Sequence, residues 1–445
     1  MNPRWLIAAP MSGSGKTTIA RGLMALFARR GWRVQPFKCG PDYIDTKFHA
    51  AACGRPSINL DTFMASRHHV RELFERYARE ADICIIEGMM GLFDGYDRDR
   101  GSSAEVAATL DVPIVLVVDA RSAAFSMAAL LQGFLHFRPE LRFAGIIFNR
   151  VGSERHAAML REVAAEVGID CLGCLPKSAQ LEQGSRYLGL DFSEAAETDE
   201  LMRLLEEHID LDKLTQTGLP ADHDESATPS PEGCTPCAHA APAADRQSAG
   251  LTLVARNDEA FSFIYEETLE QLRQRGPFRF FDPEEPGDAG VLRLLAALIG
   301  SDEGVALLYL PGGYPEKHVE KLVANEALRN AIRDYAERGG RIVAECGGMM
   351  YLCQSIVDDE GEHPMCGVLP YSITARKADR HLSLGYRRFE LDGREYRGHE
   401  FHYTQFLGPT PPSACQVFNA KGEPVATPVF RHKNVLASYT HLYYS

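Results

Sequence analysis

The sequence predicts an α/β fold made of two doubly wound domains. Short apolar runs of strand length alternate with amphipathic helical patterns through both halves of the 445-residue chain, which is typical of a parallel sheet covered by helices on both faces. Between the halves, residues 213–249 are rich in Pro, Ala, Ser and acidic residues and lack periodicity, as expected of a flexible linker. A chain of this length should also form two or three domains. We therefore expect one domain at 1–212 and a second at 250–445.

Six apolar runs are the expected strands of the first domain: "WLIAAP", "RVQPFKCG", "ADICIIEG", "VPIVLVVDA", "FAGIIFNR" and "DCLGCLP". The stretches "LMALFARRGW" and "MLREVAAEVGI" place apolar residues at helical spacing between them. In the second domain the same alternation runs through "GLTLVARND", "FRFFDPEE", "VALLYLPGG", "GRIVAECGG", "MCGVLPYS" and "NVLASYTH". Residues 381–406, "HLSLGYRRFELDGREYRGHEFHYTQF", instead predict antiparallel strands inserted in or added to this domain.

Composition and charge exclude several classes of protein. The formal net charge is -14, which argues against nonspecific nucleic-acid binding, so an anionic substrate would need a local basic pocket. No apolar run reaches the ~18 residues that span a bilayer, and the N-terminus lacks a signal-peptide pattern. We therefore expect a cytoplasmic protein without a nucleic-acid or membrane partner. The oligomeric state is left open, with a homodimer among the alternatives.

Eleven cysteines in such a chain are expected to be thiols rather than a disulfide framework. Two Cys-x-x-Cys pairs occur, Cys171/Cys174 in a strand-like segment and Cys234/Cys237 in the linker. One interpretation is a zinc site shared between the pairs. The other is buried thiols for the first pair and incidental thiols for the second.

A phosphate-binding loop is predicted at residues 12–18, "SGSGKTT", between the first expected strand and a helix. Such a loop holds a polyphosphate because its backbone N–H groups and the positive end of the helix point at the anion. Pro10 stands where the usual motif has its first Gly. Lys16 is expected to reach the terminal phosphates and the Thr17 hydroxyl to bind Mg²⁺. The residues expected to bind the nucleotide are Gly13, Ser14, Gly15, Lys16, Thr17 and Thr18.

Acidic residues follow two of the later strands. Asp42 and Asp45 come after "RVQPFKC", Glu87 ends "ADICIIE", and Asp94 follows it. Ligands of an open parallel sheet bind at the carboxyl ends of the strands, so these four acids are expected beside the phosphate loop, where they would bind Mg²⁺ directly or through water. Asn149 ends another strand, and its amide is expected either to read a purine edge or to cap a turn.

A reactive thiol is predicted at Cys346, in the strand–turn–helix stretch "GRIVAECGGMMYL". The helix N-terminus should lower the pKa of this thiol. Gly312 and Gly313 end the strand "ALLYLPGG", and the N–H groups of Gly313 and Gly347 are candidates for an oxyanion hole. His441, after the strand "VLASYT", completes a Cys–His pair of the kind that performs acyl transfer. A buried thiol and a packing histidine are the alternatives.

These motifs resemble those of the cobyrinate a,c-diamide synthase family. "PGGYPE", "AECGGMMYL" and "SYTH" are similar to class I glutamine amidotransferase domains, while "SGSGKTT", "PFKCGPDYIDTKFH", "GRPSINLDTFM", "EGMMGLFDG", "GSSAEVA" and "RGHEFHY" are similar to the synthases, in order along nearly the whole chain. The resemblance implies a dethiobiotin-synthetase-like P-loop domain followed by a glutamine amidotransferase domain. It also implies ATP and Mg²⁺ as cofactors, and glutamine and a corrinoid as substrates whose a and c acetate carboxylates become amides.

The resemblance implies roles for individual residues as well. Cys346 would be the nucleophile and His441 its base, and Lys16 and Thr17 would hold the triphosphate. Asn149 is counted among the ATP-binding residues for its place at a strand end. Metal binding is implied for Thr17, Asp42 and Glu87, and substrate or metal positioning for Asp45 and Asp94. Tyr443 stands two residues after the histidine, where many glutaminases have Glu, which leaves open what orients the imidazole. ATP would convert a carboxylate to an acyl phosphate, and ammonia from glutamine would attack it in a closed site.

A basic stretch in this acidic chain is a candidate for holding the carboxylates of a corrinoid. Residues 375–388, "ARKADRHLSLGYRR", contain Arg376, Lys377, Arg380, Arg387 and Arg388, and a solvated loop is the alternative. His399 and His402 are expected either to line the same interface or to be structural.

Other functions remain open. The motifs for nucleotide and glutamine do not distinguish cobyrinate from hydrogenobyrinate, nickel-sirohydrochlorin or sirohaem. A partitioning or metal-chaperone ATPase with an inert second domain would lack glutaminase activity, and a glutaminase-like binding module would lack a working phosphate loop.

Overall fold

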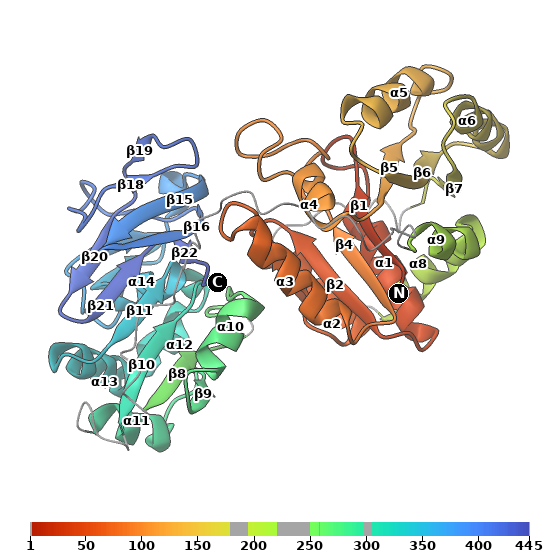
Figure 1. Cartoon of the computed structure of the whole chain (residues 1–445). Coiled ribbons are helices and arrows are strands. Elements are labelled where there is room, and N and C mark those ends of the chain that lie inside the picture. The colour runs from red at the N-terminus through yellow and green to blue at the C-terminus, as the bar shows by residue number, and fades with distance from the viewer. Residues whose placement is uncertain (1, 179–194, 220–249, 258, 298–303, 445) are drawn as a thin grey trace. The chain divides into compact units, whose positions relative to one another are not determined.

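The computed structural model describes residues 2–178, 195–219, 250–257, 259–297 and 304–444. The chain divides into two compact units, Met1–Pro236 and Cys237–Ser445 (Figure 1). Residues 220–249, which form most of the expected linker and include Cys234 and Cys237, lie outside the described residues.

A parallel sheet forms the centre of the N-terminal unit, as predicted. Its seven strands have the order β3-β2-β4-β1-β5-β6-β7, and every neighbouring pair is parallel. The strands are β1 (Arg4–Ala8), β2 (Val34–Cys39), β3 (Ile58–Leu60), β4 (Ile83–Glu87), β5 (Ile114–Asp119), β6 (Phe143–Val151) and β7 (Cys171–Pro176). Only β3 is not among the predicted strands, because three residues are too few to show a period.

Helices connect these strands or follow the last of them (Figure 1). They are α1 (Lys16–Arg29), α2 (Asp45–Cys53), α3 (Arg67–Ala78), α4 (Ser103–Leu110), α5 (Met127–Phe137), α6 (Glu154–Glu166), α8 (Ala195–His208) and α9 (Leu211–Thr217). The side chains of Ser66, Ser102 and Ser153 accept backbone N–H groups in the first turns of α3, α4 and α6, which satisfies donors that a helix start leaves unpaired. Apolar residues of α1, α8 and α9 share one buried cluster with β1, β4 and β5.

The start of the expected linker is corrected by α9. Residues 213–217 are helical rather than irregular, because Leu211 and Leu214 join the buried cluster of the sheet. The backbone N–H of Arg4 also donates to the carbonyl of Gly218 at 2.9 Å. The helical structure of this unit therefore continues past residue 212.

A second, mixed sheet forms the centre of the C-terminal unit. Its strand order is β20-β21-β11-β10-β8-β9, and every pair is parallel except β20 with β21. The strands are β8 (Leu251–Ala255), β9 (Phe278–Phe281), β10 (Val305–Leu310), β11 (Ile342–Glu345), β20 (Val429–His432) and β21 (Val435–Ser438). Helices α10 (Glu266–Arg273), α11 (Ala289–Ala296), α12 (Val319–Ala324), α13 (Glu326–Glu337) and α14 (Gly347–Leu352) accompany it, with short 3-10 turns η1 (Pro315–Lys317) and η2 (Lys377–Asp379).

The antiparallel strands predicted for residues 381–406 are confirmed. β15 (Ser383–Leu391) and β16 (Arg394–His402) pair in antiparallel register along their whole length. They belong to a five-stranded sheet with β18 (Val417–Phe418), β19 (Pro424–Val425) and β22 (His441–Leu442). A smaller four-stranded sheet contains β12 (Ser355–Val357), β13 (Glu362–Pro364), β14 (Ser372–Thr374) and β17 (Gln405–Phe406).

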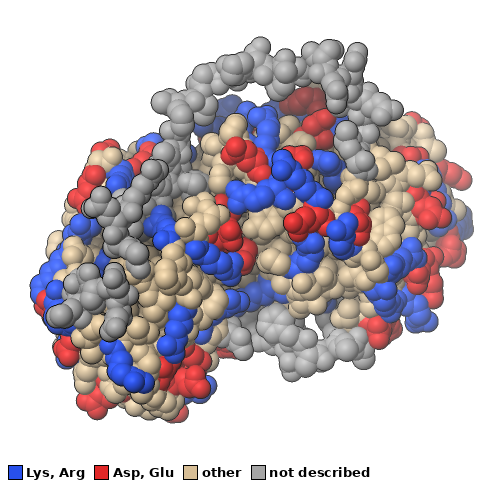
Figure 2. All heavy atoms as spheres, turned by 60° about the horizontal axis from the view of Figure 1, so that its bottom comes forward, with Lys and Arg blue, Asp and Glu red and all other residues tan. Residues whose placement is uncertain are grey.

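Charged side chains of both signs are interspersed on the surface drawn in Figure 2. Among the described residues, no helix is both long and apolar enough to cross a membrane.

Candidate active sites

Two glycines shape the loop between β1 and α1. Gly13 and Gly15 have φ of 79° and 95°, in the left-handed region that glycine adopts without strain. A Cβ atom on Gly15 would lie 2.3 Å from Nδ2 of Asn149, so a larger residue would collide with β6. Lys16 begins α1 directly after this turn, which directs the N-terminal end of the helix toward the loop.

Two strands brace the loop. Asn149 donates its Nδ2–H to the Ser14 carbonyl at 2.9 Å, while its Oδ1 accepts the backbone N–H of Arg150. Arg150 donates to the Gly13 carbonyl at 2.8 Å and pairs with Asp119 at 2.7 Å. These contacts give Asn149 a role in holding the loop, and its reading of a purine edge stays a prediction.

A buried cluster of charges lies where β2 and β4 end. Nζ of Lys38 lies 2.7 Å from Oδ2 of Asp45 and 3.0 Å from Oε1 of Glu87. Glu87 also accepts a hydrogen bond from the Thr17 hydroxyl, and its Oε2 lies 2.7 Å from Nε2 of His49. Lys38 and Glu87 are register partners in the sheet, so strand pairing itself brings them together beside the phosphate loop.

Burial and charge shift the pKa values in this cluster. Burial lowers the pKa of Lys16. Burial alone would also lower the pKa of Lys38, but Glu87 and Asp45 raise it well above its usual value. Burial alone would raise the pKa of Glu87, but Lys38 and His49 hold it below its usual value, whereas burial and the charge of Glu87 raise the pKa of Asp45. An ammonium group fixed at this place provides preorganised positive charge for a phosphoryl group.

Asp42 has a local structural contact. Its Oδ1 accepts the backbone N–H groups of Ile44 and Asp45, both at 2.8 Å, and so stabilises the entry into α2. Asn59 reinforces the same turn by donating to the Asp42 carbonyl at 2.9 Å. The carboxylate of Asp42 is therefore engaged in the turn, next to the cluster of Lys38 and Glu87.

Asp94 shapes a turn that lies against the phosphate loop. Its Oδ2 accepts the backbone N–H of Gly91 at 2.9 Å. The N–H of Leu92 donates to the Ala9 carbonyl at 2.8 Å. Asp94 thus lies near the loop, and its role in positioning substrate stays a prediction.

The oxygen donors fit Mg²⁺ when phosphates are bound. Mg²⁺ usually takes one or two protein carboxylates together with phosphate and water oxygens. The Thr17 hydroxyl and the Glu87 carboxylate are hard oxygen donors in direct contact, beside the start of α1. No group of three or more His, Cys, Asp or Glu side chains suited to a metal occurs within the described part of the chain. The protein therefore offers a partial site that phosphate oxygens would complete.

Lys38 and His49 are not among the residues predicted from the sequence. A signal exists for each of them. Lys38 is the one charged residue of the buried strand "VQPFKC", and such a residue needs a buried partner. His49 follows Asp45 by one helical turn in α2, so the two share a face of that helix.

Cys346 lies in a strained turn between β11 and α14. Its φ of 45° and ψ of -107° are rare for a residue other than glycine, and strain of this kind gathers at functional sites. Its backbone N–H donates to the Ser438 carbonyl at 2.8 Å, and its side chain is buried. The geometry matches the strand–turn–helix elbow that presents a nucleophile.

Gly312 brings His441 close to Cys346. A Cβ atom on Gly312 would lie 2.1 Å from Cε1 and 2.8 Å from Nδ1 of His441, and 3.2 Å from Cβ of Cys346. The imidazole and the nucleophile candidate therefore flank one glycine at the end of β10. His441 is also the register partner of His399 in β16.

Burial favours the neutral forms of both the thiol and the imidazole. Burial, reinforced by the carboxyl of Glu316, raises the pKa of Cys346. Burial lowers the pKa of His441 to about 3. The predicted lowering of the thiol pKa is therefore wrong, because the desolvation of the buried thiol outweighs the dipole of the six-residue helix α14. A neutral imidazole can accept the thiol proton during attack, so the pair suits general-base catalysis without a resting thiolate.

Gly313 and Gly347 direct backbone N–H groups at this sulfur. Hydrogen bonds from both N–H groups act to lower the pKa of Cys346, although burial outweighs them. A Cβ atom on Gly347 would lie 2.9 Å from the backbone nitrogen of Gly313, so the two donors lie close together. Paired donors beside a nucleophile can stabilise the oxyanion of a tetrahedral intermediate.

The structure separates the basic residues of 375–388. Arg376, Lys377 and Arg380 are exposed around η2. Arg387 is buried and pairs with Glu400 at 2.5 Å, so it is not available to an outside ligand. His402 also contacts Glu400, at 2.8 Å, and although burial alone would raise the pKa of Glu400, His402 and Arg387 lower it to about 2. Arg387 and His402 are therefore structural.

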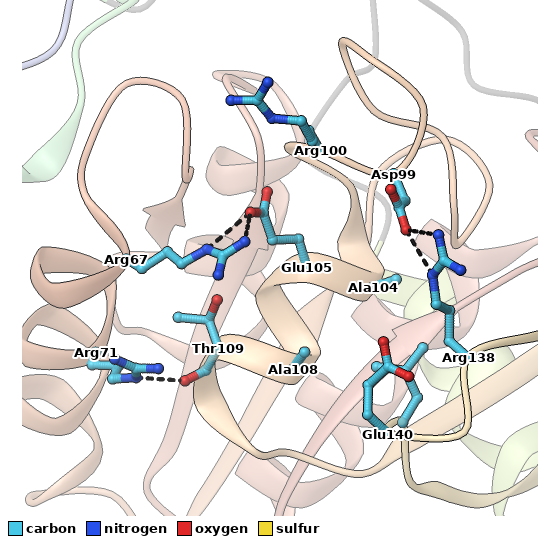
Figure 3. A pocket seen from close by; sticks show the side chains of 11 residues that line it. Arg67, Arg71, Asp99, Arg100, Ala104, Glu105, Ala108, Thr109, Arg138 and Glu140 are labelled. Carbon is cyan, nitrogen blue, oxygen red and sulfur yellow. Dashed lines mark hydrogen bonds and ion pairs between the residues drawn. The ribbon is translucent and has the colours of Figure 1, made fainter. Parts of the chain in front are cut away.

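A cavity of about 260 Å³ lies between α3, α4 and the loop before α4 (Figure 3). Arg67 pairs with Glu105 and Arg138 with Asp99, both at 2.5 Å. Arg71 instead donates to the backbone carbonyl of Thr109 at 2.8 Å. In all, the lining contains the four arginines Arg67, Arg71, Arg100 and Arg138 and the three acids Asp99, Glu105 and Glu140.

The Cys171/Cys174 pair lies in β7. The two sulfurs are 3.8 Å apart, and both residues are free cysteines, of which Cys174 is buried and Cys171 partly so. Cys234 and Cys237, the other pair of the predicted zinc site, lie outside the described residues.

Two family models match the chain. Residues 5–188 match a CobQ/CobB/MinD/ParA nucleotide binding domain. Residues 253–445 match a CobB/CobQ-like glutamine amidotransferase domain. These matches correspond to the two units that contain the phosphate loop and the Cys346 turn.

Full-length relatives are similar to the whole chain. A protein of Caldanaerobacter subterraneus subsp. tengcongensis named cobyrinate a,c-diamide synthase is 36% identical, over 98% of this chain and 94% of the relative. A protein of Pseudomonas aeruginosa named hydrogenobyrinate a,c-diamide synthase is 38% identical, over 99% of this chain and 94% of the relative. A Brucella abortus protein of the same name is 38% identical, over 98% of each chain.

Proposed function

Because this chain belongs to the family of cobyrinate and hydrogenobyrinate a,c-diamide synthases, we propose that it amidates the a and c acetate carboxylates of cobyrinate, using ATP and the amide nitrogen of glutamine. One observation carries this proposal. A single chain contains a phosphate loop with a buried cationic cluster and, in its other unit, a strained cysteine that flanks one glycine with a histidine. The first suits activation of a carboxylate, and the second suits release of ammonia. An inert second domain, as in a partitioning or metal-chaperone ATPase, does not fit the amidotransferase match of residues 253–445.

The N-terminal unit would activate the carboxylate. A carboxylate resists nucleophiles because of its charge, so the γ-phosphoryl group of ATP would be transferred to it, giving an acyl phosphate and ADP. Ammonia would then displace phosphate to form the amide. Lys16 and Lys38 would neutralise the charge of the transferring group. Mg²⁺ would be held by Thr17 and Glu87 with phosphate oxygens, and it would supply further neutralisation of the phosphates.

The C-terminal unit would release ammonia. Sγ of Cys346 would attack the side-chain amide carbon of glutamine while His441 accepts the thiol proton. The N–H groups of Gly313 and Gly347 would stabilise the oxyanion. His441 would then protonate the leaving nitrogen, which departs as ammonia, and water would hydrolyse the γ-glutamyl thioester to glutamate and free thiol.

The cavity of Figure 3 would bind further carboxylates of the tetrapyrrole. It is lined by four arginines and three acids. Arg71 donates its Nε–H to a neutral backbone carbonyl rather than to a carboxylate. Arg100 lies 3.9 Å from Asp97 in an exposed pair, which carries little energy in water. Arg71 and Arg100 are therefore the guanidinium groups best able to bind a ligand carboxylate.

The proposal is tested by separating the two nitrogen sources. With ATP, Mg²⁺ and cobyrinate, Cys346→Ala should abolish amidation from glutamine but retain amidation from ammonium salts. Lys16→Ala should abolish amidation from both sources but retain glutamine hydrolysis. Cys415→Ala is the matched control, because Cys415 is a partly buried thiol in the same unit. Glutamine-dependent amidation by the Cys346→Ala protein would contradict the proposed glutaminase site.

The same assay should include hydrogenobyrinate. Relatives of 36% and 38% identity carry the two different substrate names, which differ in the presence of cobalt in the ring. Amidation of nickel-sirohydrochlorin or sirohaem, but of neither corrinoid, would contradict the proposed substrate but not the proposed reaction.

A further inference from the structure

Glu345 is a buried carboxylic acid directly before the nucleophile candidate. It ends β11 and is 2% exposed. A buried carboxyl group is costly unless hydrogen bonds satisfy it. Burial raises the pKa of Glu345 to about 8, which favours the neutral carboxyl group.

Three donors from two separate segments satisfy this carboxyl group. The Tyr309 hydroxyl donates to Oε2 at 2.9 Å, from the neighbouring strand β10. The Tyr444 hydroxyl donates to Oε1 at 3.4 Å, and the backbone N–H of Leu442 also donates to the carboxyl group. Glu345 therefore links the central sheet to residues 442 and 444 of the C-terminal segment.

This segment carries His441. The strand β22 contains only His441 and Leu442, and its ladder to β16 consists of two register pairs. So short a strand contributes few hydrogen bonds of its own, and each is worth only about 0.5–1.5 kcal/mol. Further anchors hold the segment beyond β22. The N–H of Tyr443 donates to the Arg397 carbonyl at 3.0 Å. Glu345 binds the residues before and after it, Leu442 and Tyr444.

Position 443 itself supplies no carboxylate to the imidazole. Tyr443 packs edge to face on Tyr265, with ring centroids 5.1 Å apart. The groups that act on the pKa of His441 are His399, His402 and Glu400, besides burial. Glu345 instead accepts the backbone N–H of Leu442, the residue directly after His441, so its effect on His441 passes through the backbone.

We propose that Glu345 is the positioning residue of the Cys346–His441 pair, holding the backbone on the C-terminal side of His441 so that the imidazole stays beside the thiol. The inference rests on the proposed glutaminase function of that pair. In many glutaminases a carboxylate near the histidine orients the imidazole. Here we assign that task to a carboxyl group next to the cysteine in sequence, together with its backbone and tyrosine donors. A neutral group with the same shape should therefore perform most of this task.

The test compares Glu345→Ala with Glu345→Gln in the full-length protein. Glu345→Ala should lower kcat for glutamine hydrolysis at least about tenfold, because a displaced base loses its alignment, while the KM for glutamine changes less than about twofold. Glu345→Gln keeps an oxygen for Leu442 and should recover most of that loss. Ammonia-dependent amidation should be the same in all three proteins, since it does not use Cys346.

Tyrosine variants extend the test to a protein whose carboxyl group is intact. Tyr444→Phe should lower kcat for glutamine hydrolysis, and by less than Glu345→Ala. Tyr335→Phe is the matched control, because it removes a buried hydroxyl that donates to the Val305 carbonyl at 2.9 Å in the same unit. It should leave kcat unchanged.

Three results would overturn the inference: glutaminase kcat of Glu345→Ala within about twofold of the wild-type value, Glu345→Gln as impaired as Glu345→Ala, or equal kcat in the Tyr444→Phe and Tyr335→Phe proteins. The second result would mean that charge rather than positioning matters. Failure of the proposed function is a separate outcome, because it would appear as glutamine-dependent amidation by Cys346→Ala whatever residue 345 is.

Discussion

Nζ of Lys38 lies 3.0 Å from Oε1 of Glu87, and both side chains are almost completely buried. The pair forms because β2 and β4 are adjacent with these residues in register. Asp45 lies 2.7 Å from the same nitrogen, so one ammonium group serves two carboxylates beside the phosphate loop. The contact that stabilises the ends of these strands therefore lies at the place where we propose that phosphate binds.

Lys38→Met should destabilise the N-terminal unit. Removing one partner of a buried ion pair leaves the other uncompensated, at a cost of about 3–5 kcal/mol. The two tryptophans of the chain, Trp5 and Trp32, both lie in this unit. Their fluorescence during urea unfolding should therefore report the loss of stability. The double variant Lys38→Met/Glu87→Gln should recover part of it, because Glu87 no longer leaves a buried charge, and only the partly exposed Asp45 loses its partner. Additive losses in the double variant would contradict the coupling of the pair.

Gly312→Ala should abolish glutaminase activity. Its Cβ would lie 2.1 Å from the His441 ring, so the imidazole must move, and a displacement of about 1 Å can cost about 100-fold in rate. Ammonia-dependent amidation should persist. Gly133→Ala is the control, because a Cβ there meets no atom within 4 Å, and both activities should stay at the wild-type level. Wild-type glutaminase activity in Gly312→Ala would remove His441 from the proposed site.

Buried histidines should make the C-terminal unit sensitive to acid. Burial and the charge of Arg387 lower the pKa of His399 to about 3, against about 6.5 in an unfolded chain. Between these values only the unfolded state takes up the proton, so stability is lost as pH falls from about 6.5 toward 3, by up to about 1.4 kcal/mol per pH unit. His399→Gln removes this pH-dependent loss of stability. Lowering the pH from 7.5 to 4.5 should therefore reduce the unfolding free energy of the wild type more than that of the variant. A gap that is constant with pH would refute the neutral, buried state of His399.

Replacing the arginines that line the cavity should weaken the binding of the tetrapyrrole but not the binding of glutamine. Arg71→Ala and Arg100→Ala should each raise the KM for cobyrinate about tenfold, as expected for loss of one charge-assisted hydrogen bond. The KM for glutamine in hydrolysis should not change. Arg203→Ala, which removes an exposed arginine of α8, is the control. Unchanged KM for cobyrinate in both cavity variants would place the substrate carboxylates elsewhere.

Patterns along the chain were sufficient to predict the parallel sheet, the phosphate loop and the cysteine turn. Each depends on neighbouring residues: apolar runs of strand length, Gly13 and Gly15 before Lys16, and Cys346 before two glycines. Burial explains the main error, the pKa of Cys346, because the desolvation of its thiol depends on how residues from distant segments pack around it. No local pattern contains that information.

Pairing between distant strands also explains the residues that were not predicted. Lys38 meets Glu87 through the register of β2 with β4, and Glu345 meets Tyr444 although 99 residues separate them. Arg387 looked like a surface cation, yet its partner Glu400 lies on the other strand of the hairpin. The linker boundary was placed too early because α9 is short, and its leucines show their role only by packing on the sheet.

The transfer of nitrogen from glutamine to the tetrapyrrole is the most direct test that one polypeptide joins the two sites. Wild-type protein would be supplied with cobyrinate, ATP, Mg²⁺ and glutamine labelled with ¹⁵N in its amide, and the product would be examined by mass spectrometry. We predict a tetrapyrrole diamide that carries ¹⁵N at both new amides, with formation of ADP. Glutamine hydrolysis without labelled tetrapyrrole, or labelled product formed without ATP, would contradict it.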